Sequence, residues 1–324
     1  MKTSFLPRLV NGQTGDPALF VDILREKRAL LFDCGTLTGL SPSEILRITD
    51  IFVTHAHIDH FIGFDHLLRL HMGRGKRVRV YGPKGIIGCV RGKLSGYTWN
   101  LVKRQRLVFE VFEVNGGRLR SSEFWCRNRF RQSGTRLLEE SEFLFEDELV
   151  QVRATILDHK IPSLGFAVTE RDFYNIDPVQ LEAMGRRPGP WLNQLKRWAR
   201  RGRDPSGTVE VDGEKLEASV LAERLLIVTP GRTLAYVADV RGSRDNREKI
   251  VELSRGADIL FCEGAFLQED KERADETYHL TAREAGELAR LADAGRLVVF
   301  HFSPKYEGRF AELEQEALRA HRGE

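Results

Sequence analysis

The sequence predicts an α/β fold in which strands carry functional side chains to one edge of a sheet. Four short apolar runs each end on a residue of metal-binding type, and segments with helical spacing of apolar residues lie between them. Strands that end in this way bring such side chains to one rim, where loops converge on a ligand. The runs are 29–32 before Asp33, 51–54 before His55, 234–238 before Asp239 and 297–300 before His301.

Three segments show helical patterns. Apolar residues recur at roughly helical spacing over 61–70, so a helix is expected directly after a cluster of histidines. Thr281 and Glu284 match a capping box, which predicts a helix from there to about Asp293. A third helix is expected over 310–320. The histidine cluster therefore lies in the loop that opens the first of these helices.

Two segments differ in composition from the rest. Residues 171–223 are rich in Gly, Pro and Arg and have little apolar periodicity, so we expect an insertion that projects from the core. Residues 115–148, with mixed Arg and Glu, are expected to form a smaller insertion. At 324 residues the chain is interpreted as one domain, 1–324, that carries these insertions.

The composition is that of a globular protein. With 41% apolar and 30% charged residues the chain is neither a fibre nor disordered, and a net charge of +3 says little about partners. The first residues lack the apolar core of a signal peptide, and no run approaches the length of a membrane span, so we predict no membrane association. Cys34, Cys89, Cys126 and Cys262 show no CxxC spacing; free thiols and a cytoplasmic location are expected.

Three imidazoles and one carboxylate lie within six residues in the string from His55 to His60. Imidazole nitrogens and carboxylate oxygens are ligands of divalent metals such as zinc. Alternation on an extended segment aims His55 and His57 the same way, and Asp59 and His60 can then face a second metal. The alternative, ordinary polar residues on a loop, is disfavoured by this compact spacing.

The string resembles the signature of the metallo-β-lactamase superfamily, which implies a four-layer αββα sandwich with one or two metals at the sheet edge. The other parts of that pattern follow in order. The resemblance implies one metal on His55, His57 and His159, a second on Asp59, His60 and His301, and Asp239 as the bridge. Asp33 matches an aspartate expected to hydrogen-bond near the histidine loop, although a turn-forming Asp before Gly35 is the alternative.

Three further segments resemble ribonuclease Z, a family of endonucleases that trim the 3′ side of precursor tRNA. They are 159–166, 301–306 and the pair Glu263 and His279. The resemblance implies that Asp59 orients or deprotonates the attacking water while it ligates a metal. His279, held by Glu263, is expected to contact the phosphate or to protonate the leaving oxygen.

Three departures from that family stand out. Lys305 replaces an arginine expected to bind a phosphate, and lysine lacks the bidentate geometry of arginine. Cys262 stands where the family commonly has a histidine, and residues 4–20 lack the expected glycine-rich opening.

Residues 186–203 are basic and contain no acidic residue. Trp191 and Trp198 lie among the basic residues, so the segment offers cations for phosphates and aromatic faces for bases, as in the protruding tRNA-binding arm that it resembles. The alternative is a solvated pair of basic helices. The basic residues are Arg186, Arg187, Lys196, Arg197, Arg200, Arg201 and Arg203.

These resemblances imply a metal-dependent phosphodiesterase, an endoribonuclease for precursor tRNA, with two divalent metal ions. Zinc is expected, with manganese or iron as alternatives, and a homodimer is implied. A phosphodiesterase for small or cyclic nucleotides, or another ester hydrolase of this fold, would not need the basic arm. An RNA-binding protein without catalysis is disfavoured by the complete ligand set.

Overall fold

The computed structural model describes residues 5–24, 26–139, 141–200, 204 and 206–324. The chain forms two compact units: one comprises 1–144, 152–168 and 233–324, and the other 145–151 and 169–232. The predicted insertion 171–223 lies inside the second unit, which extends beyond it on both sides.

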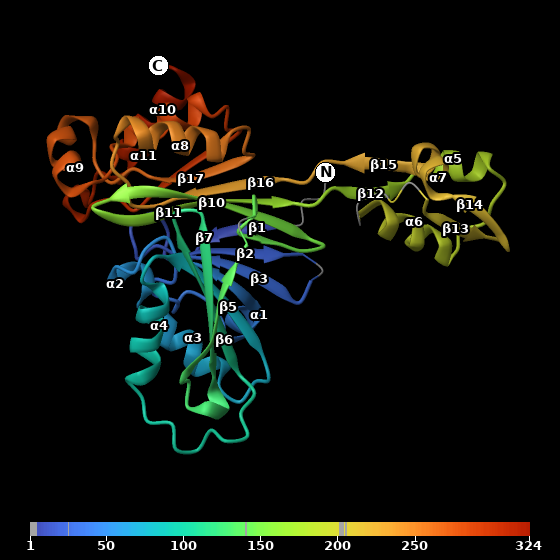
Figure 1. The fold of residues 1–324 in the computed structure, drawn as a ribbon. Coiled ribbons are helices and arrows are strands. Elements are labelled where there is room, and N and C mark those ends of the chain that lie inside the picture. The colour runs from blue at the N-terminus through green and yellow to red at the C-terminus, as the bar shows by residue number, and fades with distance from the viewer. Residues whose placement is uncertain (1–4, 25, 140, 201–203, 205) are drawn as a thin grey trace. The chain divides into compact units, whose positions relative to one another are not determined.

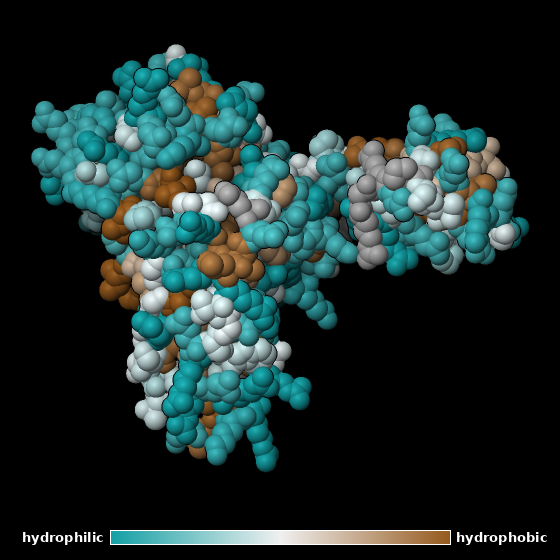
Figure 2. Space-filling model, viewed as in Figure 1, coloured by the Kyte–Doolittle hydropathy of each residue, from teal (hydrophilic) through white to brown (hydrophobic). Residues whose placement is uncertain are grey.

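None of the helices in the described residues is long and apolar enough to span a membrane. The face drawn in Figure 2 is mainly hydrophilic.

The first sheet of the larger unit follows the order of the sequence. In the described residues its strands are β1 (Phe5–Leu9), β2 (Leu19–Ile23), β3 (Arg28–Phe32), β4 (Ile48–Phe52), β5 (Arg77–Pro83), β6 (Val108–Asn115), β7 (Arg118–Trp125) and β8 (Gln132–Leu138). β3 to β6 are parallel and the outer pairs are antiparallel. The prediction that 115–148 forms a small insertion is wrong for the residues of β7 and β8. These strands extend the first sheet, and Phe124 of β7 is buried in its core.

The second sheet brings together strands that are distant in sequence. Its order is β18-β17-β16-β11-β10-β9, formed by β18 (Leu297–Phe300), β17 (Ile259–Glu263), β16 (Thr233–Val237), β11 (Ile161–Glu170), β10 (Val150–His159) and β9 (Phe145–Glu146). β16, β17 and β18 are parallel, so their carboxyl ends share one edge. The predicted strands at 29–32, 51–54, 234–238 and 297–300 are confirmed to within a few residues.

The two sheets face each other through aromatic side chains. Phe166 lies 5.8 Å from Phe32 and 5.6 Å from Phe52, measured between ring centroids, and Tyr236 lies 5.8 Å from Phe32. Helices cover the two outer faces (Figure 1), which confirms the four-layer αββα sandwich. On the first sheet these are α1 (Pro42–Arg47), α3 (Phe64–His71) and α4 (Ile86–Ser95), and on the second α8 (Arg244–Ser254), α10 (Ala282–Leu291) and α11 (Phe310–Arg322).

The helices after the strands follow the predicted signals with one interruption. The predicted helix at 61–70 is divided into α2 (Ile58–Phe61) and α3, with Gly63 between them. A Cβ at Gly63 would lie 2.0 Å from the carbonyl oxygen of Gly35, so this close approach requires glycine. The capping box of Thr281 and Glu284 opens α10 as predicted.

The second unit has its own small core. Trp191, Leu195, Leu221 and Leu225 are buried there, together with Val211. Its elements are β12 (Phe173–Ile176) paired with β15 (Leu226–Thr229), β13 (Thr208–Val211) paired with β14 (Glu214–Glu217), and the helices α5 (Pro178–Ala183), α6 (Pro190–Arg200) and α7 (Ala218–Leu225).

Candidate metal centre

The predicted ligands gather at the edge where several strands end. His55 follows β4 on an extended segment, His159 ends β10, and Asp239 and His301 follow β16 and β18. His301 has a backbone φ of 63°, as Asp33 after β3 has a φ of 55°. Left-handed conformations are costly for residues with a Cβ and cluster at functional sites, where the surrounding structure holds them. The chain therefore turns sharply at this edge.

Asp239 lies between two groups of side chains. Its Oδ2 is 3.7 Å from His55 Nε2 and 3.6 Å from His159 Nε2, whereas its Oδ1 is 3.4 Å from His60 Nε2 and 2.9 Å from His301 Nδ1. One oxygen thus faces each group. The structure brings together all seven predicted ligands: His55, His57 and His159 with Asp239, and Asp59, His60 and His301 beside it.

The donors of this cluster fit divalent metal ions. The Nε2 atoms of His55 and His60 are buried, and neither has a hydrogen-bond partner among the described residues. Buried polar atoms are normally paired, so two unsatisfied nitrogens that point toward a carboxylate call for an additional partner. Imidazole nitrogens and carboxylate oxygens in sets of three or four match the ligand sets of zinc and related cations.

The charges at the cluster also suit cation binding. Burial opposes ionisation of Asp239, but the imidazoles of His301 and His60 outweigh it and hold the pKa of Asp239 well below its usual range. Burial opposes ionisation of Asp59, but its hydrogen bond to His301 and the charges of His60 and His301 together outweigh it and lower the pKa of Asp59 to about 2. Burial and the neighbouring His60 lower the pKa of His55 to about 2. Both carboxylates are therefore ionised and His55 is neutral, the forms that bind a metal. Burial opposes the charged forms of His60 and His301, but the nearby carboxylates outweigh it, raise the pKa of His60 and raise that of His301 to about 10, so a metal would have to displace a proton from each.

Asp33 is fully buried and accepts hydrogen bonds from both sheets. Its Oδ1 accepts the backbone N–H of Thr54 at 2.7 Å, and its Oδ2 lies 2.8 Å from His60 Nδ1 and 3.0 Å from the Tyr236 hydroxyl that donates to it. The Thr54 hydroxyl lies 3.0 Å from the carboxylate of Asp33 and 3.0 Å from His55 Nδ1. Asp33 thus holds the Nδ1 proton of His60 directly and that of His55 through Thr54, which leaves both Nε2 lone pairs for a metal.

Tyr236 was not identified from the sequence. It comes from the apolar run before Asp239, and its burial raises the pKa of its hydroxyl well above the usual range. The signal was present, because Tyr236 carries the single hydroxyl of the apolar run 234–238, and such a hydroxyl needs a buried partner when the strand is central.

The predicted catalytic pair is also formed. His279 Nδ1 lies 2.8 Å from Glu263 Oε2, and the fully buried Glu263 accepts the backbone N–H of Val240 through its other oxygen. Burial disfavours the imidazolium of His279, but the charge and hydrogen bond of Glu263, together with the charge of Asp239, outweigh it and raise the pKa of His279. Its ring lies 5.1 Å from that of His159. The departure at Cys262, which is buried in β17, leaves this pair intact.

Lys305 is near this edge but already paired. Its Nζ lies 2.6 Å from Asp270 and above the ring of Tyr306. The side chain lines a pocket together with His279 and His301. A phosphate contact from Lys305 would therefore compete with Asp270.

The predicted arm residues lie in the second unit and differ in their surroundings. Arg186 forms ion pairs with Asp212 at 3.3 Å and Glu214 at 2.6 Å, so its charge is locally balanced. Arg187, Arg197 and Arg200 are exposed, Lys196 is half-buried, and Arg201 and Arg203 lie outside the described residues.

The proposed aromatic faces of the arm require a correction. Trp191 is only 5% exposed because it packs into the core of the second unit, so the expectation that it meets bases is wrong. Trp198 is half-buried and donates to the carbonyl of Asp204 at 2.9 Å. The basic character of 186–203 does not show whether a tryptophan in it is exposed or lies on the apolar face of α6.

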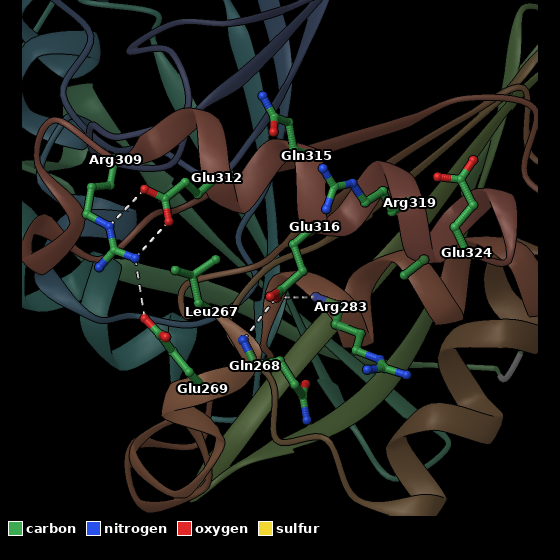
Figure 3. A pocket seen from close by; sticks show the side chains of 11 residues that line it. Leu267, Gln268, Glu269, Arg283, Arg309, Glu312, Gln315, Glu316, Arg319 and Glu324 are labelled. Atoms are coloured by element: carbon green, nitrogen blue, oxygen red, sulfur yellow. Dashed lines mark hydrogen bonds and ion pairs between the residues drawn. The ribbon is translucent and has the colours of Figure 1, made fainter.

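A separate polar pocket lies beside α11 (Figure 3) and contains none of the predicted site residues. Glu316 points across it and accepts the backbone N–H groups of Gln268 at 2.9 Å and Arg283 at 3.2 Å. These contacts fix both ends of the segment that carries His279, so α11 anchors that segment.

Comparisons with known proteins agree with this geometry. Residues 17–85 match the family model described as the metallo-beta-lactamase superfamily, and residues 213–302 match a beta-lactamase superfamily domain. Ribonuclease Z of Deinococcus radiodurans is 30% identical over 308 residues, which cover 93% of this chain and 91% of that protein. Ribonuclease Z of Anoxybacillus flavithermus is 33% identical and covers 93% and 85%, respectively.

Solved structures with the same fold include the short form of human tRNase Z, with a TM-score of 0.52, 21% identity and 93% coverage of both chains. The metallo-beta-lactamase fold protein YhfI of Bacillus subtilis has a TM-score of 0.55 at 15% identity and covers 96% of this chain and 91% of that one. At these identities the structures show a shared fold.

Proposed function

We infer that this chain, which belongs to the ribonuclease Z family, is a metal-dependent endoribonuclease that removes the 3′ trailer of precursor tRNA. The observation that carries this proposal is the position of Asp239, with one carboxylate oxygen toward each of two donor groups. The Glu263–His279 pair lies at the same edge. A metal-dependent hydrolase of phosphodiesters can use both features, a cation-binding centre and a proton donor.

Within the centre, His55, His57 and His159 would hold one metal, Asp59, His60 and His301 the other, and Asp239 would bridge them. We propose zinc, which suits this set of nitrogen and oxygen donors. When bound, two such ions make water a better nucleophile at neutral pH and stabilise negative charge on the phosphate.

The remaining steps fall to side chains of the chain. Asp59 is ionised and partly exposed, so it can orient the attacking water and accept its proton. His279, whose charged form is stabilised by Glu263, donates a proton to the 3′ oxygen that leaves the phosphorus. The products would be a tRNA with a 3′ hydroxyl and a trailer with a 5′ phosphate.

Recognition of the tRNA body is assigned to the second unit. Arg187, Arg197 and Arg200 are exposed there, so they can neutralise phosphates. The predicted role of Arg201 stays a prediction, as do the homodimer and the cytoplasmic location. Arg186 is a weaker candidate, because Asp212 and Glu214 compete with a phosphate for it.

In the decisive experiment, the purified, metal-replete protein is incubated with a 3′-extended precursor tRNA and, separately, with cyclic nucleotides. We expect one cut at the trailer junction, a 3′ hydroxyl on the tRNA and slow or no hydrolysis of cyclic nucleotides. Preferential hydrolysis of the cyclic nucleotides would replace the proposal with a small-molecule phosphodiesterase. Fewer than about one bound metal per chain would contradict the two-metal centre.

A further inference from the structure

A group of exposed cations lies at the end of the first sheet where β5 and β6 begin and β7 ends. They come from three loops, one before β5, one before β6 and one after β7. The backbone N–H of Cys126 donates to the carbonyl of Leu107 at 2.9 Å. That of Val108 donates to the carbonyl of Lys76 at 3.0 Å, so the three loops meet. We call their exposed cations the polybasic end: Arg74, Lys103, Arg104, Arg106, Arg127, Arg129 and Arg131.

The polybasic end lies at the other end of the strands from the metal centre. β3 to β6 are parallel, and Asp33 and His55 follow the carboxyl ends of β3 and β4. The amino ends of β5 and β6 are therefore at the opposite edge of the sheet, and the loop between α4 and β6 lies at the lower end of the larger unit in Figure 1. The seven cations are not among the candidate metal ligands and do not line the pocket that contains His279. The proposed chemistry does not use them.

The cations of the polybasic end have no acidic partners. Residues 96–109 and 124–138 contain no Asp or Glu, and none of the seven cations forms an ion pair within the part of the chain that the structure describes. Exposed Arg244, Arg255 and Arg322 of the larger unit, by contrast, each pair with a glutamate within four residues. The whole chain carries a net charge of only +3, so the remainder of it is net negative. Like charges that repel one another at one place indicate a polyanionic ligand that neutralises them.

Buried side chains fix the loops that carry these cations. Phe130 is 3% exposed, and its ring lies 4.8 Å from that of Trp99, so an aromatic pair joins the loop after β7 to the loop before β6. Arg129 and Phe130 have φ angles of 56° and 52°, a left-handed backbone that is costly for residues with a Cβ and that clusters at functional sites. The Arg127 guanidinium lies 4.5 Å from the centre of the Trp125 ring, which restricts its motion. The loops are therefore held in place before a ligand binds, which lowers the entropy cost of binding.

We propose that the polybasic end is a separate RNA-binding surface, which holds the phosphate backbone of RNA outside the segment that enters the metal centre. The choice of RNA as the polyanion rests on the proposed function, but binding at this surface needs no cleavage. Six of the seven cations are arginines, which can bind a phosphate through two parallel hydrogen bonds. Contacts to phosphates carry no sequence information, so the surface binds RNA of any sequence. It adds affinity for long transcripts without changing which bond is cleaved.

The first test compares two triple variants that change the net charge equally. Each replaces three exposed arginines by glutamate, one set at the polybasic end and the other on α8 and α11 or at their ends, where each arginine is paired. The first variant is Arg104→Glu/Arg127→Glu/Arg131→Glu, and the control is Arg244→Glu/Arg255→Glu/Arg322→Glu.

We expect the first variant to bind an RNA duplex of about 20 base pairs at least about tenfold more weakly than the unmodified protein, with a salt slope of log K smaller by up to about three. The control should lose less than about threefold in affinity, because its arginines contact no phosphate. Equal losses in the two variants, or no loss in the first, at equal melting temperatures would overturn the proposal. Because binding is measured without cleavage, a loss confined to the first variant would uphold the surface even in a protein that failed to cleave precursor tRNA.

The second test uses milder substitutions and separates RNA from an anionic membrane. Arg104→Gln/Arg131→Gln, which keeps the length of the loops and adds no negative charge, should lower the salt slope for duplex RNA by up to about two. Leu101 is 86% exposed in the loop before β6, and a membrane-bound protein would use such an apolar side chain as an anchor. Leu101→Ser should leave RNA affinity unchanged. Tighter binding to vesicles with about 30% anionic lipid than to RNA, with loss of that binding in Leu101→Ser, would assign the surface to a membrane and refute the RNA proposal.

Discussion

Tyr236→Phe should weaken metal binding although Tyr236 is not among the candidate metal ligands. The substitution removes the hydroxyl that donates to Asp33 Oδ2 at 3.0 Å and keeps the ring, which stacks on Phe300 at 5.2 Å. Asp33 then keeps its contacts with Thr54 and His60 but loses one of the donors that fix its orientation. Because Asp33 in turn orients His60, the effect should reach the centre.

The size of the effect follows from the kind of bond. A hydrogen bond to a charged, buried acceptor contributes about 1.5–3 kcal/mol, and each 1.4 kcal/mol corresponds to a factor of about ten in an equilibrium constant. Part of that loss will appear as lower stability of the metal-free fold. Removing a partner that orients a metal ligand commonly costs about 10- to 100-fold in metal affinity. We therefore expect about a tenfold loss for Tyr236→Phe. For Asp33→Asn, which removes the charge, about a hundredfold is expected.

The assay is a competition titration of metal-free protein against a chromogenic zinc chelator, with metal content measured independently and the melting temperature of the metal-free form recorded. Tyr97→Phe is the matched control. Its hydroxyl also lies near a carboxylate, that of Asp65, but the side chain is 49% exposed and is not among the candidate ligands. Unchanged zinc affinity in Tyr236→Phe, with only a lower melting temperature, would refute the orienting role of the Asp33 network.

Three further predictions concern separate parts of the chain. His279→Ala should lower turnover by about 100-fold or more with metal content unchanged, because His279 acts as a proton donor; loss of metal in this variant would show that it is a ligand instead. Charge reversal of Arg197 and Arg200 together should weaken tRNA binding and reduce the salt slope of log K by up to about two, as measured by filter binding at several salt concentrations. An unchanged slope would remove these residues from the interface. Leu195→Ala should destabilise the second unit by about 2–5 kcal/mol, visible as faster hydrogen exchange there, while metal content stays constant; a parallel loss of metal would contradict the separation into two units.

The centre could be predicted from the sequence because its signals are local. His55, His57, Asp59 and His60 lie within six residues after a strand, and the strand ends at Asp239 and His301 are marked by apolar runs that stop on a ligand. The four-layer sandwich was predicted from the resemblance of these residues to the metallo-β-lactamase signature. In the structure these ligands lie together as predicted, because the carboxyl ends of neighbouring parallel strands meet at one edge of a sheet.

The features that could not be predicted depend on contacts between segments that are distant in sequence. Tyr236 meets Asp33 across two sheets, a contact with a separation of 203 residues that no local pattern encodes. Trp191 looked like part of a basic surface; Leu195 follows it at helical spacing, but the core that both share with Leu221 is known only from the structure. We predicted an insertion at β7 and β8, because the exposed edge strand β8 and the outward-facing residues of β7 carry the mixed charges of a loop.

The position of the donors along the chain has a consequence for synthesis of the protein. Residues from His55 to His301 contribute to the centre, so its donors are spread over most of the larger unit's sequence. A ribosome-bound chain that has not reached His301 lacks a donor of the second group, and one without α11 lacks the Glu316 contacts behind His279. The centre can therefore form only once the chain through His301 has been synthesised.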